Sequence, residues 1–191
     1  MFEAFLEAAR EAATRVHPNN ARMAEIIMDS AEQLHRPVVE PLDLPTHNYS
    51  WHWTSKIMQA SNVEDLYSEL DAITCNAERS QAYRYVAARL AKDGQFTEAL
   101  TIADGIAYPE FKVEAFLDVA RYQIAGRVFT NALETLMIAE SVGRDISSPV
   151  KQAFAHRDIA GLRHVAGDDC GARQSILDGL KVLTFYKQTL P

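Results

Sequence analysis

The chain has 191 residues, of which 48% are hydrophobic, and carries a formal net charge of −7. The hydrophobic fraction is typical of a globular protein that buries a core, and it exceeds that of a disordered chain. The negative charge argues against nonspecific attraction to nucleic acid or to an anionic membrane. The length fits one large domain, or one domain with a small appendage.

The first residues lack the features of a signal peptide, because Glu3, Glu7 and Glu11 interrupt the apolar run. No window approaches the roughly 18 apolar residues of a membrane-spanning helix. The two cysteines, Cys75 and Cys170, lie far apart in the sequence, and no Cys/His spacing indicates zinc. Separate thiols in a reducing compartment are favoured over a disulfide. We therefore expect a cytoplasmic protein without a membrane span.

Residues 1–36 predict a pair of helices. The segments Met1–Thr14 and Asn20–Leu34 have helical apolar spacing, and they flank the helix-breaking sequence His17-Pro18-Asn19. Two arrangements remain open for this pair. It either caps the rest of the protein or forms a separate appendage.

Residues 37–49 predict an extended connector. Pro37, Pro41 and Pro45 recur every four residues, a spacing that excludes a helix interior and stiffens the chain. Val38-Val39 is the only short run that resembles a strand, and prolines enclose it. We therefore expect essentially no β-structure.

The stretch from His47 to Trp53 is the most unusual in the sequence. One interpretation is a metal site that joins His47 and His52 with Asp43, but a spacing of five does not suit one helix face and no further ligand is evident. A second interpretation is that the two tryptophans seal the junction between connector and helices. A third interpretation is that Trp51 or Trp53 contacts a partner.

From about residue 50 onward the sequence repeats. Moving the segment that begins at Ala82 forward by 33 residues superposes seven similar or identical pairs. They are Ala82 on Ala115, Val86 on Val119, Ala87 on Ala120, Phe96 on Phe129, Thr97 on Thr130, Ala99 on Ala132 and Leu100 on Leu133. A further shift of 40 places Val119-Ala120 on Ile159-Ala160, and we expect the seven extra residues to lie in the loop Gly143–Pro149. A recurring period of this kind indicates a repeat protein.

Each repeat predicts two antiparallel helices. In the best-defined repeat, Ser80–Ala91 forms the first helix, Gly94 suits the left-handed position of the turn, and Phe96–Ile106 forms the second helix. Pro109 is expected to close this unit and Pro149 the next. Small residues would let the paired helices approach closely. They are Ala87, Ala99, Ala120, Ala132, Ala160 and Ala172.

The run Asp93–Leu100 resembles the middle of a tetratricopeptide repeat (TPR), where a glycine, an aromatic and an alanine lie at the helix crossing. Val86-Ala87 and Leu90 have the spacing of that family's first-helix packing residues. The periods of 33 and 40 depart from the family's 34, and Asp169 stands where the third aromatic belongs. The resemblance implies an all-α fold, with antiparallel helical hairpins stacked as a short right-handed TPR-like solenoid over residues 50–191.

The resemblance also implies a concave groove lined by the first helix of each hairpin. Its exposed positions lie one helical turn apart. The residues placed there are Arg84 and Lys92, Leu117 and Arg121, Arg157 and His164, with Trp51 from a weaker preceding unit. Arginines with apolar spots between them predict an acidic peptide or helix as the partner. The alternative is that several arginines pair with acids of the adjacent helix, such as Glu114 or Asp118.

No catalytic or cofactor motif is present in the sequence, and Asp168-Asp169 falls at a turn, where it is expected to cap the last helix. We therefore expect a non-catalytic protein–protein interaction module, such as an adaptor, chaperone or regulator, that needs no cofactor. A metal-binding regulator or enzyme with a site at His47 and His52 is the alternative. Nucleic-acid binding is disfavoured by the acidic charge and the lack of basic runs.

Overall fold

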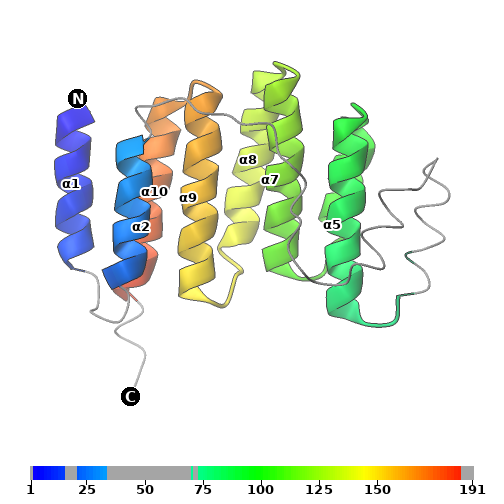
Figure 1. The fold of residues 1–191 in the computed structure, drawn as a ribbon, viewed down its shortest axis with the longest axis horizontal. Coiled ribbons are helices and arrows are strands. Elements are labelled where there is room, and N and C mark those ends of the chain that lie inside the picture. Colours follow the sequence, from blue (N-terminus) through cyan, green and yellow to red (C-terminus); the bar gives the residue numbers. More distant parts are fainter. Residues whose placement is uncertain (1, 16–20, 34–69, 71–72, 186–191) are drawn as a thin grey trace. The chain divides into compact units, whose positions relative to one another are not determined.

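The computed structural model describes residues 2–15, 21–33, 70 and 73–185, and every regular element in these ranges is a helix (Figure 1). The described helices are α1 (Phe2–Thr14), α2 (Ala21–Gln33), α5 (Asn76–Lys92), α6 (Phe96–Asp104), α7 (Pro109–Ala125), α8 (Phe129–Gly143), α9 (Pro149–Val165) and α10 (Asp169–Phe185). The expectation of an all-α protein is thus confirmed for this part of the chain. The predicted connector and the stretch His47–Trp53 lie outside the described residues.

The helices group into two compact units. The central unit comprises α5, α6, α7 and the part of α8 up to Thr135. The terminal unit comprises α1, α2, the part of α8 from Leu136, and α9 and α10. None of the described helices is long and apolar enough to cross a membrane.

The repeat seen in the sequence recurs in the helix boundaries. The helices α5, α7 and α9 each have 17 residues, and they begin at Asn76, Pro109 and Pro149, which are offsets of 33 and 40 residues. The additional residues of the longer offset were expected in a loop, and this expectation is wrong. Because α8 has 15 residues where α6 has 9, most of the difference lengthens a helix.

Local sequence explains where these helices begin and end. Pro109 and Pro149 occupy the first position of α7 and α9, where a missing N–H is tolerated, rather than closing the preceding units as expected. Gly94 follows α5 with φ 81°, the left-handed conformation predicted for it. The Asp168 carboxylate accepts a hydrogen bond of 2.8 Å from the backbone N–H of Gly171, so the predicted cap of α10 is confirmed.

In the central unit, α5 packs against both α6 and α7, and α6 also contacts α7. Small side chains allow this close packing, because Ala87, Ala99 and Ala120 are all 0% exposed, as expected. The aromatic positions of the expected helix crossing differ from the prediction. Phe129 is 41% exposed and Phe96 is half-buried, so the large aromatic of this core is Phe116 of α7.

In the terminal unit, α9 packs along α10, while α1 and α2 pack against α10 and α2 also contacts α9 (Figure 1). Buried apolar side chains from all four helices form one core. They are Ala9, Ala24, Ile27, Met28, Ala153, Ala160, Ala172, Ile176, Leu180 and Leu183. Among the described helices, the first two in sequence therefore share a core with the last two.

Candidate functional site

Two of the predicted groove residues meet around one buried carboxylate in the central unit. The Nε atom of Arg84, on α5, donates to Oδ2 of Asp118, on α7, at 2.8 Å. Arg121 donates from Nη1 to Oδ1 of the same carboxylate at 2.8 Å, and Arg84 also pairs with Glu114. For Arg84 and Arg121 the structure therefore has the acid pairing that the sequence left as an alternative. We call Arg84, Glu114, Asp118 and Arg121 the Asp118 cluster.

The electrostatics of the Asp118 cluster favour its charged state. Burial disfavours the charged form of Arg84, but the carboxylates of Asp118 and Glu114 outweigh this effect, so the pKa of Arg84 is raised. Burial raises the pKa of the neighbouring Tyr122, and the charge of Asp118 adds to the shift. Two arginines and two acids leave the cluster without net charge. It is therefore not the basic surface expected from the sequence.

The other groove candidates lie in different settings. Leu117 is only 3% exposed, so its assignment to an open groove is wrong: its side chain belongs to the core of the central unit. Lys92 is exposed at the last position of α5. In the terminal unit, Arg157 donates from Nε to Asp158 at 2.8 Å, and Nδ1 of His164 lies 2.6 Å from the carboxylate of Asp169.

The structure thus brings only Arg84 and Arg121 together among the predicted site residues, and Trp51 lies outside the described residues. Sequence reasoning named Asp118 as a pairing acid and missed its central position. The available signal was an acid inside the apolar run from Phe116 to Ala120, where a charge is tolerated only when it is paired.

A second buried cluster, centred on Glu140, joins α8, α9 and α10 in the terminal unit. Arg163, which is 8% exposed, donates from Nη2 to Oε2 of Glu140 at 2.7 Å. The hydroxyl of Ser175 lies 3.4 Å from Oε1 of the same carboxylate. Nδ1 of His156 lies 3.9 Å from Oε1, which is too long for a hydrogen bond.

Two buried nitrogen atoms of this cluster lack a hydrogen bond among the described residues. His156 is 5% exposed, and neither its Nδ1 atom nor Nε of Arg163 has a hydrogen-bond partner in the described part of the chain. Burial lowers the pKa of His156, and Arg144 and Arg163 lower it further against the opposite effect of Glu140 and Asp178. The imidazole is therefore neutral at pH 7.

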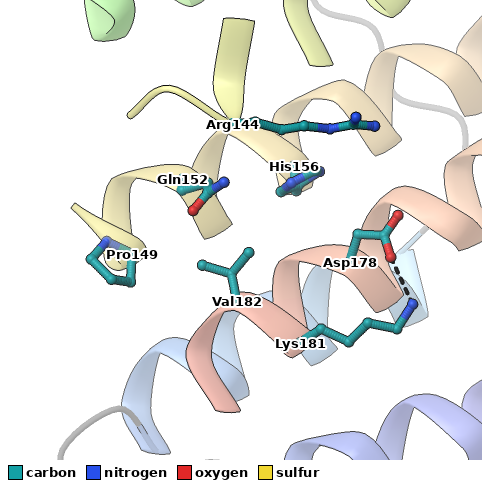
Figure 2. Close-up of a pocket in the computed structure, with 7 residues that line it drawn as sticks. All are labelled: Arg144, Pro149, Gln152, His156, Asp178, Lys181 and Val182. Carbon is teal, nitrogen blue, oxygen red and sulfur yellow. Dashed lines mark hydrogen bonds and ion pairs between the residues drawn. The ribbon is translucent and has the colours of Figure 1, made fainter. Parts of the chain in front are cut away.

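A pocket of about 520 Å³ opens beside His156 in the terminal unit (Figure 2). Its lining comes from the turn before α9, from α9 and from α10, and consists of Arg144, Pro149, Gln152, His156, Asp178, Lys181 and Val182. On α10, Nζ of Lys181 lies 2.8 Å from Oδ1 of Asp178. Burial alone would raise the pKa of Asp178, but hydrogen bonds from Lys181 and Gln174 lower it overall.

Comparison of the chain with protein-family models, with curated proteins and with solved structures gives no match. Within the described ranges, no group of three or more histidine, cysteine, aspartate or glutamate side chains is arranged to hold a metal ion. The alternative metal site at His47 and His52 falls outside these ranges. Cys75 and Cys170 are both exposed, and neither forms a disulfide.

Proposed function

We propose that this protein is a non-catalytic protein–protein interaction module whose helical pairs stack as a short right-handed TPR-like solenoid. The observation that supports it best is the recurrence of α5, α7 and α9 as 17-residue helices at the offsets found in the sequence. Ala87, Ala120 and Ala160 occupy equivalent positions on these helices, and all are 0% exposed. A scaffold that repeats one unit buries its packing faces and leaves a row of equivalent positions for a partner.

The partner-binding face that we propose lies on α5 and α7, over the Asp118 cluster. The ion pair between Arg84 and Asp118 is buried, whereas the Glu114 side chain at the edge of the cluster is 45% exposed. A carboxylate from a partner takes the place of Glu114 on Arg84, and this exchange keeps the buried pair intact. Each charge-assisted hydrogen bond contributes about 1.5–3 kcal/mol before ordering costs.

Two further features of this face favour an acidic peptide or helix. Tyr85 and Tyr122 are partly exposed beside the cluster and offer aromatic surface with a polar end. Lys92, exposed at the end of α5, adds a positive charge. Adaptor, chaperone and regulatory proteins all use faces of this kind, and a cofactor is not needed for any of these roles.

Selection of displayed peptides on the immobilised full-length chain tests the proposal. We expect the wild-type protein to enrich acidic peptides, with binding that weakens as salt increases. The double variant Arg84→Gln/Arg121→Gln should weaken the binding of these peptides at least about tenfold. A matched control is Arg22→Gln/Arg127→Gln, which removes the same charge from two exposed arginines outside the cluster and should bind normally.

The variant Glu114→Gln keeps the test informative if the double variant fails to fold. It leaves both hydrogen bonds of Asp118 in place and removes the acid that competes for Arg84. We expect it to bind acidic peptides more tightly than the wild type. Failure to enrich acidic peptides, or affinities that neither Glu114→Gln nor the double variant changes, would overturn the proposal.

A further inference from the structure

We propose that the pocket between α9 and α10 in the terminal unit binds a small organic acid with a single carboxylate group. The pocket volume of about 520 Å³ lies within the range of about 300–1,000 Å³ that is usual for small-molecule sites. Its wall combines charged, polar and apolar side chains (Figure 2). This site is separate from the proposed peptide-binding face, which lies in the central unit.

The charges of the wall leave one cation available to a ligand. Lys181 is paired with Asp178 at 2.8 Å. The guanidinium of Arg144 has no hydrogen bond or ion pair with any residue that the structure describes. Because a guanidinium presents parallel N–H groups that match the two oxygens of a carboxylate, Arg144 is the anchor that we assign to the ligand's acid group.

The neighbouring polar groups fit a carboxylate as well. The side-chain amide of Gln152 is without a hydrogen bond among the described residues, and it lies next to His156 on the α9 wall (Figure 2). The His156 ring, whose side chain is 94% buried, also lines the pocket, while its Nδ1 atom lies 3.9 Å from Oε1 of Glu140. The Gln152 amide can therefore donate to a carboxylate held by Arg144 without breaking a hydrogen bond to any described residue.

The same wall disfavours an anion with two charges. Asp178 lines the pocket, and the carboxylate of Glu140, which is not part of the lining, lies 3.9 Å from Nδ1 of His156. Both acids repel a second negative charge, so a monocarboxylate is preferred over a phosphate or a dicarboxylate. Pro149 and Val182 provide apolar surface for a short carbon chain.

An anion in the pocket also favours the protonated form of His156, whose Nδ1–H would face Glu140. The other charged groups that act on this ring are Arg144, Arg163 and Asp178. The α2 helix also packs against α9, and its charged residues with described side chains are exposed, namely Arg22, Glu25 and Asp29. Binding should therefore take up a proton and tighten as the pH falls toward about 6.5 and below, because the pKa of the free protein's His156 is lowered from its usual value.

The test is titration of the full-length protein with acetate, butyrate and hexanoate, monitored by ligand-observed NMR and calorimetry. Inorganic phosphate and succinate are the comparison ligands. We expect a monocarboxylate to bind at millimolar concentration or below, more tightly than either comparison ligand. The variant Arg144→Gln should weaken this binding at least about tenfold, whereas Arg22→Gln should not.

A second variant checks the role of His156. In His156→Gln, binding of the monocarboxylate should persist at pH 8 but lose its increase toward pH 6, because the proton acceptor is gone. If Arg144→Gln binds like the wild type, or if phosphate binds more tightly than every monocarboxylate, the assignment of the pocket is wrong. Either result leaves the peptide-binding proposal untouched, since that proposal depends on Arg84 and Arg121 of the central unit.

Discussion

In the central unit, the buried carboxylate of Asp118 binds two arginines, one through each oxygen. In the terminal unit, the carboxylate of Glu140 binds one arginine, Arg163, and faces a neutral histidine that it does not contact by a hydrogen bond. Both clusters join helices that are distant in sequence. The first has its carboxylate bonded on both oxygens by charged partners, which suits a structural link. In the second, the His156 ring also lines a pocket, which suits a binding site.

The largest effect that separates the two clusters is expected from Asp118→Asn. This change leaves Arg84 and Arg121 without their buried counter-charge, and loss of one partner of a buried ion pair costs about 3–5 kcal/mol. Chemical denaturation should show a decrease at the lower end of this range, because Arg121 is partly exposed. The matched control Asp104→Asn removes an exposed acid and should change the free energy of unfolding by less than about 0.5 kcal/mol.

A smaller loss is expected from Glu140→Gln in the terminal unit. Only Arg163 loses its counter-charge, and it keeps its hydrogen bonds to the backbone oxygen of Gly171 and the hydroxyl of Ser175. We expect the free energy of unfolding to fall by about 2 kcal/mol. If this change were as damaging as Asp118→Asn, the two clusters would have the same structural role, and the contrast between them would fail.

The turn after the first helix of each repeat allows a subtler comparison of the units. Arg127 follows α7 with φ 59°, while Gly94 and Gly167 occupy the equivalent positions after α5 and α9. A left-handed backbone is unfavourable for arginine and readily adopted by glycine. Thermal unfolding should therefore show that Arg127→Gly stabilises the protein by about 1 kcal/mol and that Gly167→Ala destabilises it by a similar amount. If both variants changed the free energy of unfolding in the same direction, the two turns would not be equivalent.

The smallest expected effect is the contribution of His156 to the pH dependence of stability, which is absent at neutral pH. Because the folded-state pKa of His156 is lowered, the unfolded chain binds a proton that the folded chain does not as the pH falls below about 6.5. Stability should therefore decrease with acidification until the folded-state pKa is passed, and His156 should contribute nothing to this dependence above about pH 7. Denaturation of His156→Gln and wild type across this window measures the difference. An identical pH dependence would show that the ring is not held neutral.

Much of the fold could be predicted from local sequence. The 33-residue offset, the alanines at the crossings, Gly94 and the cap at Asp168 all depend on spacing or on the conformational preference of one residue. The added length of α8 was missed because the end of that helix is supported by tertiary contacts. Ala139 is 0% exposed, and Glu140 pairs with Arg163 of α9. Neither contact is visible in the local sequence, which places a glycine at residue 143 and a proline at residue 149.

The candidate sites were less accessible to prediction. Acid pairing of Arg84 could be foreseen as an alternative, because Glu114 and Asp118 lie one repeat further along the chain. The repeat pattern predicts a groove position for Leu117, but it does not show which face of α7 is buried, and the side chain is 3% exposed. The pocket is lined by residues from the turn before α9, from α9 and from α10. No spacing in the sequence indicates that Arg144 and Lys181 line the same pocket.

The shared core of α1 and α2 with α9 and α10 has a consequence for how the protein is made. During synthesis on the ribosome, the apolar faces around Ile27 and Met28 emerge long before Ile176 and Leu180 of the same core exist. The helices of the central unit are complete in the meantime, so that unit is free to fold first. The terminal unit closes only after α10 has been translated as far as Leu183, and contacts of such long sequence separation form slowly. Until then α1 and α2 expose apolar side chains that are buried in the folded protein, and a chaperone would bind the nascent chain during this interval.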